Sequence, residues 1–251
     1  MLRVKTSDSK MWKTCIGMMA NLVEEAAFNF SEKGVRTRAM DPSRVALVDL
    51  EIPREAFSEY QLNEPTVLGV NLIEMDRVLS RGKSDDELAM ELDRDGGRLN
   101  MIFRGASTRK LSLPIMDLPE AELPEPKIPF TAAVEIIAGV LQDGLKDAEL
   151  VGETVRLEAG GEEFSMSSES DKGRTELKLQ KGDQGLIRIA AKQQARATYG
   201  INYLSNILKS AESGKTVALN FGTDLPMQLD YPIADGRGRL RFLLAPRVEV
   251  E

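Results

Sequence analysis

Two stretches of the sequence, Leu68–Ile73 (LGVNLI) and Tyr199–Leu204 (YGINYL), decide the fold. They lie 199 − 68 = 131 residues apart, and each runs through a short helical pattern into a basic, glycine-containing turn, SRGKSDDE in the first half and SAESGKT in the second. Each half then continues with the apolar alternation of a half-buried strand, Leu88/Met90/Leu92 and Val217/Leu219/Phe221. The same succession repeated at a fixed offset indicates a duplicated unit.

A proline-rich segment separates the two halves. Four of the eleven prolines, Pro119, Pro124, Pro126 and Pro129, fall within Asp117–Pro129 (DLPEAELPEPKIP). Because proline fixes φ and removes a backbone donor, this segment is predicted to be an extended, semi-rigid connector. The predicted domains are therefore residues 1–116 and 130–251, joined by a connector over 117–129. An ordinary linker between unrelated domains would have the same composition.

Apolar residues at helical spacing predict four short helices, at about 9–23, 72–81, 131–145 and 200–211. The remaining apolar stretches have the pattern of strands and turns, at 45–52, 99–103, 110–115, 155–159, 163–167, 175–179, 185–190, 227–231 and 240–244. Two or more strands per helix favour an α+β fold: two similar domains, each of antiparallel sheet with two helices.

Composition excludes several classes of function. The 251 residues include no histidine, which removes imidazole acid–base catalysis, and a single cysteine, Cys15, which cannot form an internal disulfide or a thiolate metal cage. Neighbouring carboxylates such as Asp85/Asp86 and Glu24/Glu25 are the remaining candidates for acid–base chemistry. No nucleotide-binding GxxxxGK[ST] loop is present. We expect no catalytic residues, no metal and no cofactor, and we expect Cys15 to be a small buried side chain.

Charge and hydropathy bear on partners and location. The formal net charge of −7 argues at first against a nucleic-acid partner, since duplex binding depends on phosphate neutralisation. No run of 18 apolar residues exists and the first residues lack the apolar core of a signal peptide, so neither membrane insertion nor secretion is expected.

Five stretches in order carry a resemblance to a known family: 34–45 (GVRTRAMDPSRV), 68–72, 116–118 (MDL), 224–226 (DLP) and 244–249 (LAPRVE). With them, the whole chain resembles the proliferating cell nuclear antigen (PCNA) family, the sliding clamps of archaea and eukaryotes. The terminal stretch and YGINYL look most like the archaeal branch. The resemblance implies a homotrimeric ring of six domains, with helices facing a central hole and sheets forming the outer wall.

In function, the resemblance implies a non-enzymatic processivity factor for DNA replication and DNA repair. Such a ring encircles duplex DNA without sequence preference, tethers DNA polymerase and other replication and repair proteins, and is opened by an ATP-driven clamp loader. The resemblance implies a cytoplasmic, nucleoid-associated protein, or a nuclear protein if the source is eukaryotic.

For DNA binding, the resemblance implies basic side chains on the inward helices, where loose phosphate contacts retain the ring without fixing its position. The residues carried over are Lys10, Lys13, Arg77, Arg81, Lys83, Lys146 and Lys209. Arg81, Lys83 and Lys146 would alternatively serve subunit contacts, and a solvated helix face is the simpler interpretation of all seven. A local basic surface of this kind is compatible with a negative net charge.

For partner docking, the resemblance implies an apolar pocket that receives peptides of the QxxLxxFF type, whose aromatic anchors would carry most of the affinity. The residues carried over are Met40, Arg44, Val45, Leu118, Leu123, Pro226, Leu243, Ala245 and Pro246. For Met40 and Val45, ordinary core packing is the alternative interpretation.

Ring closure requires two unlike edge strands that pair between subunits. Residues 108–115 (TRKLSLPI) and 174–180 (RTELKLQ) are the candidates, because both alternate apolar and polar side chains. The predicted subunit-interface residues are Arg109, Leu111, Leu113, Asp143, Asp147, Leu177 and Leu179. For the two aspartates, a solvated acidic stripe is the alternative.

Three other hypotheses remain open from the sequence. Within the family, the chain would be one subunit of a heterotrimeric clamp. Outside it, the chain would be a protein-binding scaffold that never meets DNA, or a monomeric two-domain carboxylate hydrolase. The oligomeric mass discriminates the ring from the monomer.

Overall fold

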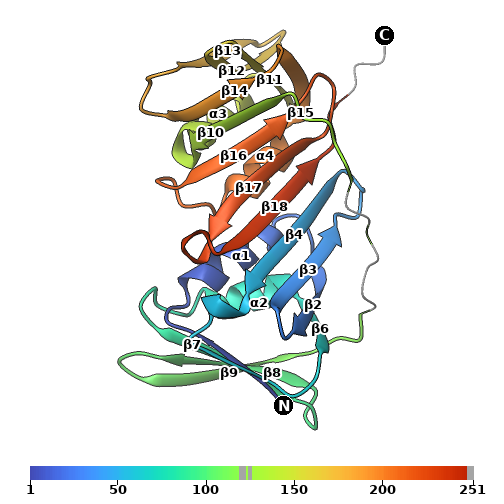
Figure 1. Ribbon diagram of the computed structural model, residues 1–251, viewed down its shortest axis with the longest axis vertical. Coiled ribbons are helices and arrows are strands. Elements are labelled where there is room, and N and C mark those ends of the chain that lie inside the picture. Colours follow the sequence, from blue (N-terminus) through green and yellow to red (C-terminus); the bar gives the residue numbers. More distant parts are fainter. Residues whose placement is uncertain (119–122, 124–125, 248–251) are drawn as a thin grey trace. The chain divides into compact units, whose positions relative to one another are not determined.

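The computed structural model describes residues 1–118, 123 and 126–247, and the chain divides into two compact units (Figure 1). Unit 1 comprises Met1–Pro42, Val48–Leu123 and Pro232–Leu240, and unit 2 comprises Ser43–Leu47, Pro124–Tyr231 and Arg241–Glu251. Pro119 and Pro124 of the predicted connector, and Val248 and Glu249 of the terminal stretch, lie outside the described residues.

Unit 1 contains an antiparallel sheet of five strands in the order β5-β1-β7-β8-β9. Further strands follow the order β4-β3-β2-β6, and the helices α1 and α2 pack against each other. The bounds are β1 Leu2–Thr6, α1 Lys10–Ala20, β2 Glu25–Ser31, β3 Gly34–Met40, β4 Ala46–Pro53, a 3₁₀ turn Arg54–Ala56, β5 Glu59–Leu62, β6 Thr66–Asn71, α2 Leu72–Leu79, β7 Glu87–Asp93, β8 Arg98–Arg104 and β9 Thr108–Pro114.

Unit 2 repeats this plan, with a four-stranded antiparallel sheet β13-β12-β11-β15, strands in the order β14-β10-β16-β17-β18, and helices α3 and α4 in contact. The bounds are β10 Ala132–Ile137, α3 Ala138–Glu149, β11 Thr154–Gly160, β12 Glu163–Ser170, β13 Gly173–Gln180, β14 Leu186–Ala191, β15 Ala195–Gly200, α4 Ile201–Leu208, β16 Thr216–Phe221, β17 Met227–Ile233, a 3₁₀ turn Ala234–Gly236 and β18 Gly238–Leu244. The predicted α+β fold of two similar units is confirmed.

The core of unit 1 forms under α1. Trp12 is buried, with ring centroids 6.2 Å from Phe28 and 6.4 Å from Phe57. Cys15 is fully buried on the same helix, as the sequence predicts, and burial raises the pKa of its thiol to about 12. Because a thiol with so high a pKa stays protonated, Cys15 contributes packing rather than nucleophilic chemistry.

The predicted bounds of the third helix are partly wrong. Residues 132–137 form the strand β10, and the helix α3 runs from Ala138 to Glu149 instead of 131–145. Val134, Ile137, Ala138 and Leu141 fit helical spacing by coincidence, because a strand that leads directly into a helix supplies apolar residues to both periods. Within β10 the buried residues alternate, with Val134 and Ile136 facing the core.

The offset between equivalent positions of the two units differs from the offset between the two sequence motifs. The backbone N–H of Leu72, which begins α2, donates to the Glu24 carbonyl at 2.8 Å, and that of Ile201, which begins α4, donates to the Glu153 carbonyl at 2.9 Å. The structural offset is therefore 201 − 72 = 129, two residues less than the offset between the motifs. The two asparagines therefore occupy different places: Asn71 precedes its helix and caps it, whereas Asn202 lies inside the first turn of α4.

Each unit ends by docking the segment that follows its last strand. In unit 1 the Met116 N–H donates to the Gly69 carbonyl on β6 at 2.8 Å, and in unit 2 the Arg247 N–H donates to the Thr198 carbonyl on β15 at 2.7 Å. Gly69 and Thr198 are counterparts at the offset of 129. The same carbonyl position therefore anchors both segments.

In the part of the chain that the structure describes, none of the helices is long and apolar enough to cross a membrane.

Candidate functional site

The basic residues predicted for unit 1 lie on or just after the paired helices α1 and α2. Lys10 and Lys13 are exposed on α1, while most of that helix is buried. Arg77 is exposed on α2 and forms an ion pair with Glu74 at 2.6 Å. Lys13 lies close enough to act on Asp76 of α2: burial raises the pKa of Asp76, and the positive charge of Lys13 opposes that shift. Lys13 and α2 therefore share one polar surface.

Arg81 and Lys83 lie in the exposed turn after α2, where their backbones bind within unit 1. The Arg81 carbonyl accepts from Arg109 at 2.7 Å, and the Lys83 carbonyl accepts from the Ser9 hydroxyl at 2.7 Å. Their side chains project from a fixed turn, which suits contact with either DNA or a neighbouring subunit.

In unit 2 the structure brings Lys146 and Lys209 together. They line a shallow groove of about 500 Å³ between α3 and α4, with Gln142, Ser205 and Asn206 among the other lining residues. Lys146 pairs with Asp143 at 2.9 Å, but both side chains are more than 70% exposed, so the pair is worth only a few tenths of a kcal/mol. Lys146 therefore remains accessible to another anion.

Both predicted ring-closing strands are edge strands. β9 ends the five-stranded sheet of unit 1, and β13 ends the four-stranded sheet of unit 2. Leu113 on β9 is buried, and Leu111, Leu177 and Leu179 are half-buried. Leu177 faces α3 of its own unit, where a Cβ on Gly144 would lie 3.1 Å from the Leu177 Cδ1. These leucines thus lie wholly or partly within their own unit. The backbone N–H and C=O groups on the outer edge of each strand are available to pair with a strand of another subunit.

Arg109 is engaged within unit 1. Its guanidinium forms an ion pair with the buried carboxylate of Asp86 and lies 5.5 Å above the ring of Phe103. Asp86 also accepts the Lys83 N–H at 3.0 Å. Asp86, one member of the Asp85/Asp86 pair weighed above for acid–base chemistry, is therefore a structural support of the β9 edge.

The unit 1 residues predicted for peptide binding are Met40, Leu118 and Leu123, all half-buried. Leu118 lies against Gly69: a Cβ there would lie 2.8 Å from the Leu118 Cγ and 2.5 Å from the Met116 carbonyl oxygen. The Leu123 carbonyl accepts from Arg38 at 2.8 Å, and Arg38 also pairs with the buried Asp49. The start and the middle of the connector are thus fixed on strands of unit 1.

Gly69→Ala is expected to lower the free energy of unfolding by about 1–3 kcal/mol, because the new methyl group must displace the Met116 backbone and Leu118. Denaturant unfolding at a fixed protein concentration measures the change. Gly214→Ala is the matched control, since a Cβ at Gly214 would meet nothing within 4 Å. Equal stabilities of the two variants would show that the connector does not rest on Gly69.

The unit 2 residues predicted for peptide binding are Arg44, Val45, Pro226, Leu243, Ala245 and Pro246. Arg44 is exposed and has a left-handed backbone with φ of 58°, whereas the other five are half-buried. The Ala245 N–H donates to the Val45 carbonyl at 2.9 Å, which brings the terminal segment to the loop after Met40. Each of these five side chains is thus partly exposed, and part of its apolar surface is available for contact.

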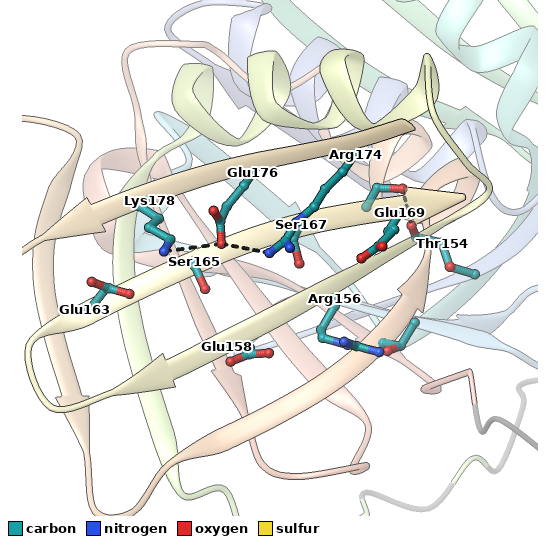
Figure 2. A pocket seen from close by; sticks show the side chains of 12 residues that line it. Thr154, Arg156, Glu158, Glu163, Ser165, Ser167, Glu169, Arg174, Glu176 and Lys178 are labelled. Carbon is teal, nitrogen blue, oxygen red and sulfur yellow. Dashed lines mark hydrogen bonds and ion pairs between the residues drawn. The ribbon is translucent and has the colours of Figure 1, made fainter. Parts of the chain in front are cut away.

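One polar surface was not predicted from the sequence. A hollow of about 280 Å³ lies on the four-stranded sheet of unit 2, and Figure 2 shows Arg174, Glu176 and Lys178 in a row along β13. Glu176 pairs with Arg174 at 3.4 Å and with Lys178 at 3.3 Å. Alternation of polar residues along β11–β13 was the available signal. Among the described residues no three His, Cys, Asp or Glu side chains are grouped to hold a metal ion.

The sequence and the fold were compared with those of known proteins. The family model "Proliferating cell nuclear antigen, N-terminal domain" matches residues 1–122, and the C-terminal domain model matches residues 125–247. The chain therefore belongs to the proliferating cell nuclear antigen family. It is 42% identical over 96% of both chains to a protein of Thermococcus gammatolerans named DNA polymerase sliding clamp.

Solved structures agree with this assignment. The PCNA of Thermococcus kodakaraensis superposes with a TM-score of 0.94 and 29% identity, covering 98% of this chain and all of that one. The PCNA in the complex described as "C-terminal region of FEN-1 bound to A. fulgidus PCNA" superposes with a TM-score of 0.88 and 25% identity, with all of both chains covered. The resemblance to archaeal sliding clamps that the sequence motifs predict is confirmed.

Proposed function

We propose that this protein is a DNA polymerase sliding clamp, three copies of which form a ring around duplex DNA. The observation that carries the proposal is the match to both clamp domains along almost the whole chain, together with a relative of that name at 42% identity. The edge strands β9 and β13 support ring closure, since each has one side without a paired strand in the described part of the chain.

The DNA contacts in this proposal come from Lys10, Lys13, Arg77, Arg81 and Lys83 in unit 1, and from Lys146 and Lys209 in unit 2. Exposed lysines and arginines on the helices and in the turns that follow them would supply phosphate contacts without base contacts. Such contacts allow sliding, because they carry no sequence information. The ring acts as a tether rather than an enzyme and needs no metal or cofactor.

Partner proteins, including DNA polymerase, the clamp loader and repair enzymes, would dock through QxxLxxFF-type peptides. In this proposal the peptide contacts Met40, Leu118 and Leu123 of unit 1 and Arg44, Val45, Pro226, Leu243, Ala245 and Pro246 of unit 2. The complex of the C-terminal region of FEN-1 with A. fulgidus PCNA supports peptide docking in the family. The predicted domain limits at 116/117 and 129/130 and a cytoplasmic, nucleoid-associated location belong to the same proposal.

Primer extension tests the function directly. The assay uses an archaeal replicative DNA polymerase and singly primed DNA, with a clamp loader present or with a free DNA end onto which the ring can thread. Under these conditions the protein is expected to lengthen the products several-fold. Linear DNA with both ends blocked and no loader is the control, because a closed ring cannot thread onto it. Products of equal length with and without the protein would leave the scaffold hypothesis standing instead.

A further inference from the structure

Strand β15 contacts two segments that carry residues of the proposed peptide site. One is the turn between β16 and β17, residues 222–226. There the Asp224 N–H donates to the Arg196 carbonyl at 3.0 Å, and the Thr223 hydroxyl accepts the Arg196 N–H at 3.3 Å. A third contact comes from Tyr199, whose hydroxyl donates to the Leu225 carbonyl at 2.8 Å. Pro226 follows directly.

The other segment is the end of the described chain. The carbonyl of Thr198, the neighbour of Tyr199, accepts the Arg247 N–H at 2.7 Å. Pro246 precedes Arg247, and the Ala245 N–H donates to Val45. Two successive residues of one strand, Thr198 and Tyr199, therefore hold the segments that carry Pro246 and Pro226.

The backbone of the turn has an uncommon conformation. Asp224 has φ of 53°, a left-handed conformation that is uncommon for a residue with a Cβ, although aspartate adopts it more often than most residues. Gly222 permits a close approach within the turn, since a Cβ there would lie 2.8 Å from the Leu225 Cδ1. The hydrogen bonds from β15 help to hold the turn in this conformation.

The Tyr199 hydroxyl is suited to a permanent contact. Tyr199 is fully buried, and burial, with a smaller effect of the nearby Asp224 carboxylate, raises the pKa of its phenol. The hydroxyl is therefore a neutral donor at any physiological pH. Removing it would leave the carbonyl of Leu225, which is half-buried, without that donor.

The repeat shows that the fold does not require this hydroxyl. At the offset of 129, Tyr199 pairs with Val155 on β11 as Val70 pairs with Ala26 on β2. Val70 is as deeply buried as Tyr199 but has no polar group. The same strand position is thus filled by an aliphatic side chain in unit 1, and the hydroxyl is a special feature of unit 2.

We infer that Tyr199 is a positioning residue for partner docking: its hydroxyl fixes Leu225 and Pro226 relative to the terminal segment that β15 also holds. The inference rests on the proposed function, since it names a residue that shapes the proposed peptide site. Tyr199 itself is buried and does not touch the peptide.

Tyr199→Phe tests the inference with the smallest change. The trimer and its melting temperature are expected to remain close to those of the unmodified protein, while the affinity for a synthetic QxxLxxFF peptide, measured by calorimetry, falls about tenfold. Tyr231→Phe is the matched control: Tyr231 is also buried in unit 2, but its hydroxyl accepts the Glu212 N–H at 3.2 Å, away from residues 222–226. Amide exchange is expected to quicken at Asp224 and Leu225 in Tyr199→Phe only.

Each outcome decides the inference. Unchanged peptide affinity or unchanged exchange at Asp224 in Tyr199→Phe overturns it while leaving the proposed docking site intact. An equal loss of affinity in both variants also overturns it, because any buried hydroxyl would then matter. Failure of the unmodified protein to bind the peptide overturns the proposed docking site itself, and the inference with it.

Discussion

Reversing two charges, Asp143→Lys with Asp147→Lys, is expected to convert the trimer into monomers at micromolar concentration. The mass in solution would fall from about 3 × 27.7 ≈ 83 kDa to 27.7 kDa, measured by light scattering. Both side chains are exposed on α3 and lie four residues apart, so they present one acidic surface. In the proposed ring this surface meets basic residues of the neighbouring subunit, and like charges placed there cost several kcal/mol per interface.

The fold itself should tolerate the reversal. Asp143 forms an ion pair with Lys146, which is exposed and weak. Asp95→Lys with Asp171→Lys is the matched control, since both residues are exposed in turns and the change in net charge is the same. A trimer that survives the reversal at Asp143 and Asp147 would remove these residues from the interface. An unmodified protein that runs as a monomer and joins no sibling chain would contradict the ring altogether.

Replacing Lys13, Arg77 and Lys209 together by alanine is expected to weaken retention on DNA more than any single change. Three residues in each of three subunits give up to nine phosphate contacts, and each lost contact lowers the slope of log affinity against log salt by about 0.9. The slope should therefore flatten markedly as affinity falls. Titration of the loaded ring on nicked circular DNA at several salt concentrations measures both quantities.

The control for that triple variant is Lys33→Ala, Lys172→Ala and Arg188→Ala. It removes the same number of lysines and arginines, and Arg188 matches Arg77 in exposure and in having a glutamate partner. If the slope of log affinity against log salt stays the same when Lys13, Arg77 and Lys209 are replaced, these residues do not lie next to DNA. A slope that falls equally in both variants would mean that charge acts at long range rather than by contact.

Much of this architecture could be predicted from residue spacing. The helices α1, α2 and α4 and both edge strands lie where apolar periodicity places them, because an exposed face and a buried face alternate cleanly there. Seven strands lie outside the predicted set, namely β1, β2, β3, β5, β6, β10 and β15. β3 could not be predicted from apolar alternation, because glycine, threonine and alanine occupy buried positions that usually carry larger side chains.

The sequence names candidate site residues one by one, and their roles stay predictions, but it does not reveal the contacts that hold them. Leu118 is taken from a motif and Lys13 from the family resemblance, whereas the bond of Arg38 to Leu123 joins residues 85 apart. Arg109 was predicted as a subunit contact, and the structure shows it held by Asp86 within its own unit. Its contact with a neighbouring subunit stays a prediction. Partners so distant in sequence leave no local pattern, because any arginine reaches any carboxylate that the fold brings near.

The docking of a segment on the same carbonyl in both units bears on how the connector is held. In unit 2 the docked segment follows β18, and in unit 1 it is the start of the connector, yet Met116 and Arg247 bind counterpart positions. The first residues of the connector therefore belong structurally to unit 1, as part of the pattern that the two units share. The connector begins as an integral piece of its domain and not as a free spacer.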